Sequence, residues 1–306
     1  MTDKIEPNES LDEGQVTLEG LIIKGVGGFY YIETERGVIR AKGRGIFKKE
    51  GTILTVGDKV VITVRDDGDS VIEEILPRKN VFIRPPIANV DKIIIVSAVK
   101  KPKVNFDILD RFLIMAEKNN VTPVICFNKM DLAADSFKDE IEEVYGKLYK
   151  VIYVSGKTGE NLELIKDEIR GNKVAFAGPS GVGKSTIINR ISPHANLETG
   201  AISSKTNRGK HTTRHVEIFD FEGGKVFDTP GFTSFDILEV EEGELSMYYP
   251  EIFQIGQGCR FDNCRHIKEP DCAVLKALED GSLSKMRYQS YVNNLEEIRK
   301  RNRNKY

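Results

Sequence analysis

The stretch KVAFAGPSGVGKS, residues 173–185, joins an apolar strand directly to a glycine-rich loop that ends in lysine and serine. Its second part fits the pattern of two glycines followed by Lys and Ser/Thr that surrounds nucleotide phosphates. The glycines let backbone N–H groups curl around the phosphates, and the following helix adds its positive N-terminal end. A tight glycine turn without a ligand is the alternative. The predicted phosphate-binding residues are Gly178, Pro179, Ser180, Gly181, Val182, Gly183, Lys184, Ser185 and Thr186.

Apolar strands and helical segments alternate on both sides of this loop. KIIIVSAV (92–99), PVICFN (123–128) and VIYVS (151–155) precede it, and a helix is expected from about Phe106 to Asn119. Two further strands are expected between His215 and Asp228. Continuous apolar strands that alternate with helices are typical of a parallel sheet buried on both faces. We therefore expect an α/β domain around the phosphate loop.

The tetrapeptide NKMD, residues 128–131, follows the strand PVICF and indicates the base. A carboxylate at Asp131 can accept hydrogen bonds from the N1–H and N2–H₂ edge of guanine, whereas adenine presents an acceptor there. Asn128 is expected on the other side of the base, and the Lys129 stem along the ring. A loop after the next strand resembles the segment that completes a guanine pocket, with Ser155, Gly156 and Lys157.

Two further motifs follow the phosphate loop. DTPG, residues 228–231, is expected to place Asp228 on Mg²⁺ through water and the Gly231 N–H on the γ-phosphate. HTTR, residues 211–214, lies in a polar loop, where Thr213 or its neighbour Thr212 could complete the Mg²⁺ shell. With Lys184 on the β and γ phosphates and the Ser185 hydroxyl on Mg²⁺, the motifs together predict GTP rather than ATP.

The order of these motifs is unusual, because NKMD and SGK precede GPSGVGKS, and HTTR and DTPG follow it. In most small GTPases the phosphate loop comes first. Either the matches are accidental or the domain is circularly permuted. Permutation is tolerable because all these loops lie at the carboxyl ends of parallel strands and domain termini often lie close together. The DTPG segment would then run into the C-terminal part, so that the nucleotide state could reposition that part.

Hydrolysis needs a group that orients the attacking water. Many GTPases have glutamine directly after the Asp-x-x-Gly motif, but here Phe232 follows Gly231. We therefore expect intrinsic turnover on the order of 10⁻² s⁻¹ or below, rising with a partner. His211 is the candidate for the missing role, and a solvated loop histidine is its alternative. The predicted catalytic set is His211, Lys184 and Thr213.

A cysteine cluster lies near the C-terminus. Cys259, Cys264, His266 and Cys272 fall within 14 residues, a closed Cys₃His set suited to one tetrahedral structural Zn²⁺. Sulfur ligands argue against Mg²⁺ or Ca²⁺. Unrelated free thiols are the alternative. The fourth cysteine, Cys126, lies inside an apolar strand and is expected to pack in the core.

The N-terminal quarter has a different sequence pattern. Short β-like runs, at residues 16–24, 27–34, 38–42, 59–65 and 70–76, are separated by turns near residues 25–28, 35–37 and 66–68. Five short strands suit a small OB-type barrel. Residues 77–86 resemble a linker, in which two prolines enforce extended backbone.

Two basic segments are candidates for contact with an RNA backbone. One runs along the barrel from Arg36 to Lys49, and the other surrounds the cysteine cluster and continues in the final helix, from Lys285 and Arg287 onward. A solvated loop and a solubilising tail are the alternatives. The RNA-binding candidates are Arg36, Arg40, Lys42, Arg44, Lys48, Lys49, Arg299, Lys300, Arg301 and Arg303.

Composition bounds the class of protein. The 306 residues are 40% hydrophobic and 30% charged, with a net charge of -2, which excludes a uniformly basic protein. No apolar run approaches the roughly 18 residues of a membrane span. The acidic, polar first 13 residues exclude a secretory signal peptide and indicate a disordered tail. Four cysteines are too few for a disulfide framework, so a cytoplasmic, reducing environment is expected.

These motifs together resemble the ribosome small-subunit-dependent GTPase A family (RsgA, also called YjeQ or YloQ). The resemblance rests on NKMD before GPSGVGKS, the RGKHTTR loop, DTPGF and the Cys-x₄-Cys-x-His-x₅-Cys cluster, and it covers nearly the whole chain. It implies a bacterial GTPase that binds the small ribosomal subunit and its rRNA, assists late maturation, hydrolyses GTP strongly only when bound, and then leaves. It also implies His211 in hydrolysis. The acidic N-terminal extension departs from the family and has no assigned role.

The expected organisation is multidomain α+β. It comprises a disordered acidic tail (1–13), an OB-type RNA-binding barrel (14–78), a circularly permuted GTPase domain (79–236) and a helical zinc-binding domain with a basic last helix (237–306). A monomer with no membrane contact is expected, with GTP and GDP as ligands. Two other functions stay open: an RNA-binding adaptor whose nucleotide site switches but rarely turns over, and a GTPase acting on a membrane or protein machine.

Overall fold

The computed structural model describes residues 16–65, 69–192, 216–229, 232 and 240–303. These residues form two compact units, 16–89 with 216–218 and 90–192 with the described residues from 219 to 303. The predicted tail and the turn at 66–68 lie outside the described residues.

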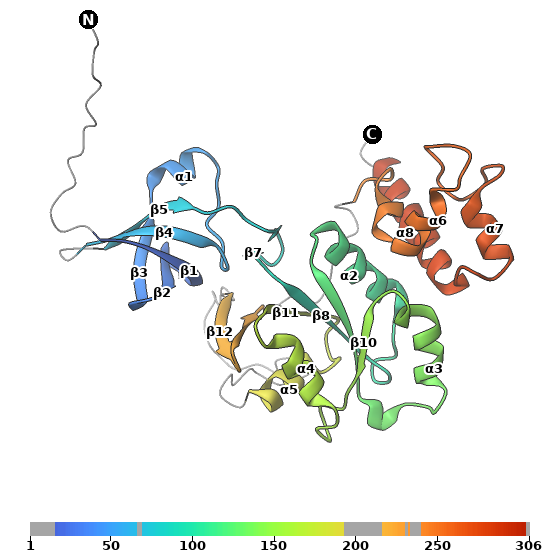
Figure 1. The fold of residues 1–306 in the computed structure, drawn as a ribbon, viewed down its shortest axis with the longest axis horizontal. Coiled ribbons are helices and arrows are strands. Elements are labelled where there is room, and N and C mark those ends of the chain that lie inside the picture. Colours follow the sequence, from blue (N-terminus) through green and yellow to red (C-terminus); the bar gives the residue numbers. More distant parts are fainter. Residues whose placement is uncertain (1–15, 66–68, 193–215, 230–231, 233–239, 304–306) are drawn as a thin grey trace, which may run out of the picture. The chain divides into compact units, whose positions relative to one another are not determined.

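The first unit is built on a five-stranded barrel, drawn in blue tones in Figure 1. The strands pair in the order β1-β2-β3-β5-β4, and β4 pairs back to β1, which closes the barrel. The β3–β5 pair is parallel, and the other pairs are antiparallel. Alternate residues of β4, Val60 and Ile62, are buried, as a half-buried strand requires. The predicted OB-type barrel is confirmed, with β1 (Val16–Val26), β2 (Phe29–Thr34), β3 (Gly37–Gly43), α1 (Gly45–Lys49), β4 (Lys59–Val64) and β5 (Ser70–Ile75).

The predicted extended linker at 77–86 is wrong. Two short strands, β6 (Val81–Phe82) and β7 (Ile87–Ala88), pair antiparallel, and residues 83–86, with both prolines, form the turn between them. Proline fixes φ near −65°, a value that turns use as readily as extended chain does. The segment is held to the barrel by Arg78, which donates to the buried carboxylate of Asp58 at 2.7 Å and 2.8 Å.

The second unit contains a parallel sheet in the order β10-β9-β8-β11-β13, with β12 beside β13. Its strands are β8 (Lys92–Ala98), β9 (Thr122–Asn128), β10 (Lys150–Tyr153), β11 (Lys173–Ala177), β13 (Gly224–Asp228) and, from residue 219 on, β12 (Glu217–Phe221). The helices of this part are α2 (Phe106–Lys118), the short η1 (Met130–Leu132), α3 (Phe137–Ile141), the π-helical η2 (Glu142–Gly146), α4 (Leu162–Ile169) and α5 (Lys184–Ile191). The described loops that contain NKMD, Ser155–Lys157 and GPSGVGKS each follow the carboxyl end of one of the parallel strands, which is where open α/β sheets bind ligands.

The helix α2 begins where the sequence predicts, because Asn105 caps it by accepting from the Ile108 N–H at 3.1 Å. It buries a helical face that includes Leu109, Phe112 and Leu113. Between the sheet and α4 and α5 lies a core of aliphatic residues, into which Cys126 packs as predicted.

The C-terminal residues form helices, drawn in orange and red in Figure 1: η4 (Leu245–Tyr248), α6 (Pro250–Gly256), α7 (Ala273–Glu279) and α8 (Lys285–Arg303). Their core includes Leu245, Ile252 and Leu295, together with Ile114 of α2. This part therefore packs on the helix that follows the first strand of the parallel sheet.

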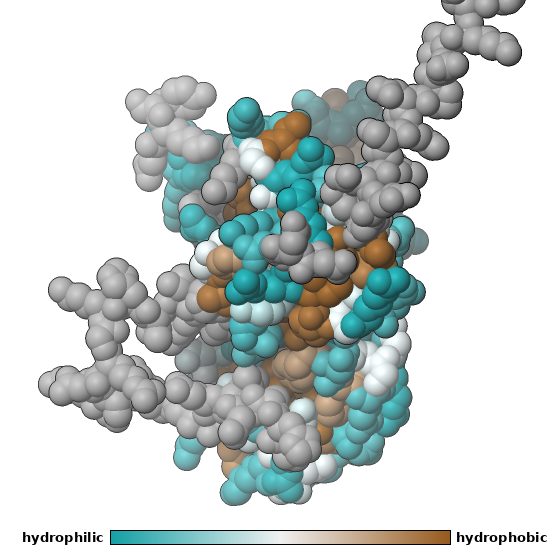
Figure 2. All heavy atoms as spheres, turned by 90° about the vertical axis from the view of Figure 1, so that its left-hand side faces the viewer, coloured by the Kyte–Doolittle hydropathy of each residue, from teal (hydrophilic) through white to brown (hydrophobic). Residues whose placement is uncertain are grey.

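No helix among the described residues is both long enough and apolar enough to cross a bilayer. On the face drawn in Figure 2, apolar side chains lie between polar ones.

Candidate functional site

The phosphate loop connects β11 to α5 and has the backbone geometry that its glycines predict. Gly178 has φ +136°, and a Cβ there would lie 2.1 Å from the Val96 carbonyl oxygen. Gly183 has φ +101°, and a Cβ there would lie 2.3 Å from Nδ2 of Asn128. Any side chain at either position would force the loop out of place. The loop is therefore fixed between the strand β8 and the residue that begins NKMD.

Lys184 is the first residue of α5 and is half-buried beside the loop. Its Nζ donates to the carbonyl oxygens of Gly178 at 2.5 Å and Pro179 at 3.0 Å. Burial lowers the pKa of Lys184 to about 8. A cation that has protein carbonyls but no carboxylate as its described partners is suited to an incoming phosphate.

Asn128 ties the guanine and phosphate elements together. Its buried side chain donates from Nδ2 to the Val182 carbonyl at 2.8 Å. Its Oδ1 accepts from the N–H groups of Gly156 at 2.9 Å and Lys129 at 2.7 Å. Both acceptor positions of the amide oxygen are thus used within the protein. The geometry favours a positioning role for Asn128, in addition to the contact with the base that its place in NKMD predicts.

The other NKMD residues lie around the same point. Lys129, in the left-handed region with φ +65°, donates from Nζ to the Gly181 carbonyl at 2.8 Å and to the Lys101 carbonyl. Desolvation lowers the pKa of Lys129, and the nearby Asp131 carboxylate opposes this. Asp131 accepts from the Ser155 hydroxyl at 2.7 Å. The structure therefore brings Asn128, Lys129, Asp131, the Ser155–Lys157 loop and the phosphate loop into one place.

The loop Ser155–Lys157 is also held from α5, by a residue that the sequence motifs do not contain. Arg190 donates to the carbonyl oxygens of Lys157 at 2.8 Å and Thr158 at 3.0 Å. Gly159 makes room for it, because a Cβ there would lie 3.0 Å from the guanidinium. The helix that begins at Lys184, the lysine predicted to bind phosphate, thus also fixes the loop predicted to complete the guanine pocket.

Replacement of Arg190 by alanine should loosen this loop and raise the Kd for GDP about tenfold, close to the worth of one charge-assisted hydrogen bond. KM for GTP should rise with little change in kcat, because the contact is the same in ground and transition states. Titration with a fluorescent GDP analogue measures the first effect. Arg170→Ala is the control, since Arg170 lies on the same domain in exposed ion pairs with Glu222 and Asp167. Unchanged GDP affinity in Arg190→Ala would exclude the positioning role.

The magnesium and hydrolysis residues are only partly described. Asp228 ends β13, and Ser185 lies in the first turn of α5, as their motifs require. His211, Thr212, Thr213 and Gly231 lie outside the described residues. Phe232 is fully buried, stacks edge-on against Phe112, and accepts through its carbonyl from the Gly178 N–H at 3.1 Å. The residue after Gly231 is therefore a core residue that cannot orient water.

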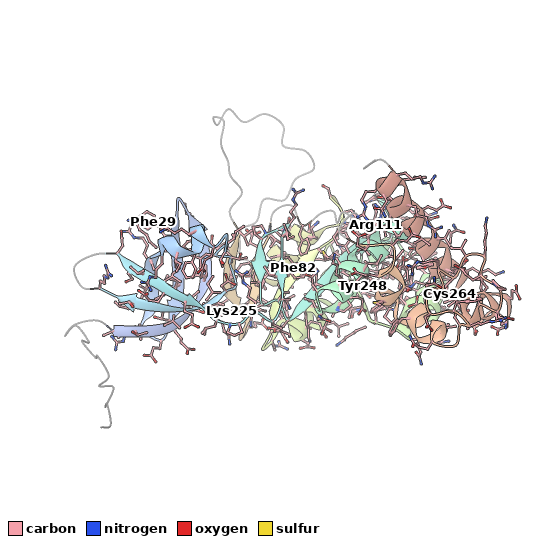
Figure 3. The ribbon with its side chains drawn as sticks, turned by 90° about the horizontal axis from the view of Figure 1, so that it is seen from above. Phe29, Phe82, Arg111, Lys225, Tyr248 and Cys264 are labelled. Atoms are coloured by element: carbon pink, nitrogen blue, oxygen red, sulfur yellow. The ribbon has the colours of Figure 1, made fainter. Side chains whose placement is uncertain are left out.

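Three of the candidate RNA-binding residues of the barrel have acidic partners. Arg40 and Lys42 share Asp69 at 2.7 Å and 2.8 Å, and Arg44 pairs with Glu73 at 2.7 Å. Both Arg40 and Lys42 also lie 4.7 Å from the ring of Phe29, which Figure 3 labels. Hydrogen bonds from the two cations lower the pKa of Asp69. Arg36 and Lys49 are exposed, and the Lys48 side chain lies outside the described residues.

In the last helix, the basic residues divide into two groups. Arg299 lies 2.8 Å from the carboxylate of Glu242 and Arg301 lies 3.6 Å from that of Glu241, while Lys300 and Arg303 are exposed. Arg287 is 1% exposed and pairs with Asp110 of α2 and Glu251 of α6. The expectation that Arg287 faces a polyanion is therefore wrong, because its guanidinium is buried and paired with carboxylates of the protein itself.

The four predicted metal ligands converge. Cys259, Cys264, His266 and Cys272 each offer one ligand atom, and these atoms lie within 4.8 Å of one another. The Sγ atoms of Cys259 and Cys272 are 3.8 Å apart, and His266 Nδ1 lies 3.6 Å and 3.5 Å from them. A tetrahedral zinc ion with its usual bond lengths separates two sulfurs by about 3.8 Å and sulfur from nitrogen by about 3.6 Å. The donor set and its spacing therefore fit one structural metal ion.

The backbone around the cluster is fixed independently of a metal. Glu269 accepts from the N–H groups of Arg265, Ile267 and Lys268 at 2.9, 2.8 and 3.0 Å, and these bonds hold its pKa at about 2 despite partial burial. Tyr288 on α8 donates to the His266 carbonyl at 2.8 Å. Figure 3 labels Cys264 in this part of the chain.

The fold and the site together define a class of protein. A parallel sheet carries a phosphate loop, an NKMD element and a Ser-Gly-Lys loop at the carboxyl ends of its strands, and these are joined by direct hydrogen bonds. The chain is a circularly permuted P-loop GTPase, an enzyme that hydrolyses GTP.

Comparison with known proteins identifies its family. The model of the RsgA GTPase matches residues 75–238, and that of the RsgA N-terminal domain matches residues 19–72. A relative in Alkaliphilus metalliredigens, the small ribosomal subunit biogenesis GTPase RsgA, is 46% identical over 93% of this chain and 99% of its own. The chain belongs to the RsgA GTPase family, as its motifs indicate.

Two solved structures are similar over almost their whole length. YjeQ from Thermotoga maritima gives a TM-score of 0.81 at 36% identity and covers 92% of this chain and 99% of its own. YloQ, described as a circularly permuted GTPase, gives 0.79 at 38% identity and covers 96% and 99%. The predicted permutation is confirmed.

Proposed function

We propose that this GTPase binds the small ribosomal subunit through its rRNA, assists late maturation of the subunit, and dissociates after subunit-stimulated hydrolysis of GTP. It acts in the cytoplasm as a monomer. The relatives named small ribosomal subunit biogenesis GTPase support the partner. The observation that carries the GTPase cycle is the convergence of the guanine and phosphate loops on Asn128.

The proposed roles of the residues follow from the site. Asp131 reads guanine, with Lys129 and the Ser155–Lys157 loop around the base. The phosphate loop from Gly178 to Thr186 holds the phosphates. Ser185, Asp228 and Thr213 hold Mg²⁺, which neutralises developing charge on the phosphates. The Gly231 N–H contacts the γ-phosphate, and His211 orients the attacking water.

Multiple-turnover GTP hydrolysis with and without purified small subunits tests the proposal. Strong stimulation is expected, because Phe232 is buried and leaves the free protein without a group at the usual water-orienting position. Absence of stimulation would favour an RNA-binding adaptor that switches without turning over. Co-sedimentation with subunits at several salt concentrations tests the contact with RNA, which should weaken steeply as salt rises.

Replacement of His211 by alanine is expected to lower subunit-stimulated kcat by 10²-fold or more, about the contribution of one positioned acid–base or water-orienting group. The Kd for GTP should change by less than about threefold, since His211 acts on water. Single-turnover hydrolysis and nucleotide titration separate the two effects. A large loss of GTP affinity would move His211 to a binding role.

Purified protein should contain one equivalent of zinc per chain. The Cys259–Cys272 and sulfur–His266 separations match a tetrahedral zinc site. Elemental analysis measures the stoichiometry, and Cys264→Ser should reduce it to well below one equivalent. Cys126→Ser, outside the cluster, is the control and should retain the metal. A folded protein without metal would contradict the assignment.

A further inference from the structure

A short basic loop lies against the nucleotide site. It connects β8 to α2 and contains Lys100, Lys101, Pro102 and Lys103. The Lys101 carbonyl accepts from Nζ of Lys129, the same atom that donates to the Gly181 carbonyl at 2.8 Å. Pro102 also reaches the phosphate loop, because its ring lies 3.9 Å from the Cβ position of Gly181. The loop is thus hydrogen-bonded to the NKMD element, and through Lys129 it is connected to the phosphate loop.

The backbone of this loop is held in an unusual conformation. Lys101 has φ +52° and Lys129 has φ +65°, so two lysines in the left-handed region meet at one hydrogen bond. A residue other than glycine in this region carries strain that the surrounding contacts must sustain. A displacement of the loop on binding a ligand would therefore also shift Lys129, because the loop is not a flexible segment that could move alone.

The lysine side chains are exposed and, within the described part of the chain, form no ion pair. Asp107, at the start of α2, and Asp131 of NKMD have other partners: Asp107 is contacted by Asn293 at 3.4 Å, and Asp131 by Ser155 at 2.7 Å. The barrel cations Arg40, Lys42 and Arg44, by contrast, are paired with acids. The loop therefore presents three positive charges within four residues at the edge of the nucleotide site.

We propose that the Lys100–Lys103 loop binds the phosphodiester backbone of small-subunit RNA, so that docking of RNA directly affects the conformation of the phosphate loop. Lysine ammonium groups bind phosphates as point charges without reading sequence. The inference rests on the proposed function. It places the contact with the RNA partner on the GTPase domain itself, beside Gly181. Hydrolysis would then be stimulated through the Lys101–Lys129–Gly181 contacts.

The test compares two double variants of the full chain. Lys100→Gln with Lys103→Gln removes two charges but keeps Lys101 and its carbonyl. Lys138→Gln with Lys147→Gln removes two exposed charges elsewhere in the same domain. Subunit binding is measured by co-sedimentation from low to high salt, with subunit-stimulated hydrolysis and GDP affinity measured alongside.

Losing two phosphate contacts should reduce the slope of log K against log salt by about 1.4 to 1.8, at 0.7 to 0.9 for each contact. Binding near physiological salt should weaken about tenfold, and stimulation should fall at equal occupancy of the subunit. GDP affinity of the free protein should stay within about twofold. The control pair should match the unsubstituted protein.

Three results would overturn the proposal. An unchanged salt slope with weaker binding would indicate a protein contact. A loss of GDP affinity in the free variant would show that the lysines serve the nucleotide. An equal loss of subunit binding in the control double variant would show that the effect comes from net charge alone. Failure of the unsubstituted protein to bind subunits is a separate result, which would remove the proposed function and this inference with it.

Discussion

Lys184→Ala should lower kcat/KM for GTP by at least about 10³-fold and leave a folded protein. Loss of a single preorganised donor to developing charge costs about 10²–10³-fold, and a charged ammonium contributes more than a neutral donor. In the structure Nζ lies beneath the loop, 2.5 Å and 3.0 Å from the carbonyl oxygens of Gly178 and Pro179. No water-exposed lysine could replace it without reorganising the loop. Phosphate release under multiple turnover measures the effect.

The free energy of unfolding should distinguish this loss of activity from misfolding. Burial disfavours the Lys184 charge, which is why its pKa is lowered to about 8 in the empty site. Removing a desolvated charge with no described carboxylate beside it should not lower the free energy of unfolding, and it should raise it slightly. Lys147→Ala, at an exposed position of the same domain, is the control for both measurements. Retention of turnover within tenfold would contradict the phosphate contact.

The parts of the site that sequence could predict are those fixed by local chemistry. A strand followed by GPSGVGKS constrains its own backbone, and NKMD after PVICF must lie at the same edge of a parallel sheet. The cysteine cluster likewise follows from spacing. For the same reason the barrel strands were predictable, since period-2 burial and glycine turns are local signals.

The long-range ties were not predictable in this way. Asn128 was expected only at the base, and its bonds to Val182 and Gly156 depend on how three separate loops meet. Arg190 lies outside every motif, and only its place six residues after Lys184, on the face of α5 toward the guanine loop, could have suggested a role. The 77–86 segment failed as a prediction because proline specifies φ, and φ alone does not distinguish extended chain from a turn.

The burial of Arg287 is indicated by a pattern in the sequence. On α8 the buried positions are Arg287, Ser290, Tyr291, Asn294, Leu295 and Ile298. This is a helical stripe with steps of three and four residues, and Arg287 occupies one of its positions. The high content of basic residues in the helix indicated a solvated surface, but the spacing of its apolar members placed Arg287 inside.

Arg287→Ala should destabilise the packing of α8 on α2 by about 3–5 kcal/mol, the usual cost of removing one partner of a buried ion pair. Asp110 is fully buried and would be left without the guanidinium that contacts it, while Glu251 would lose bonds of 2.6 Å and 3.3 Å. The guanidinium also lies 4.7 Å from the Tyr249 ring and 5.4 Å from that of Tyr145. The chain has 10 tyrosines and no tryptophan, so urea unfolding followed by tyrosine fluorescence reports on this cluster.

Two further variants identify the cause of the loss. Arg111→Ala removes another α2–α8 arginine, whose ion pair with Glu297 is solvent-accessible, with side-chain exposures of 27% and 39%, and which donates to Oδ1 of the buried Asn294 at 3.1 Å. A cost of about 1–2 kcal/mol is expected, smaller than that of Arg287→Ala. Arg287→Met combined with Asp110→Leu and Glu251→Gln removes all three charges of the cluster, and this triple variant should recover much of the stability because well-packed uncharged groups can replace a buried ion pair. If Arg287→Ala cost no more than Arg111→Ala, α8 would be held by its apolar stripe alone. The C-terminal helices could then separate from α2 at little cost, and the ion pair would not couple them to the GTPase domain.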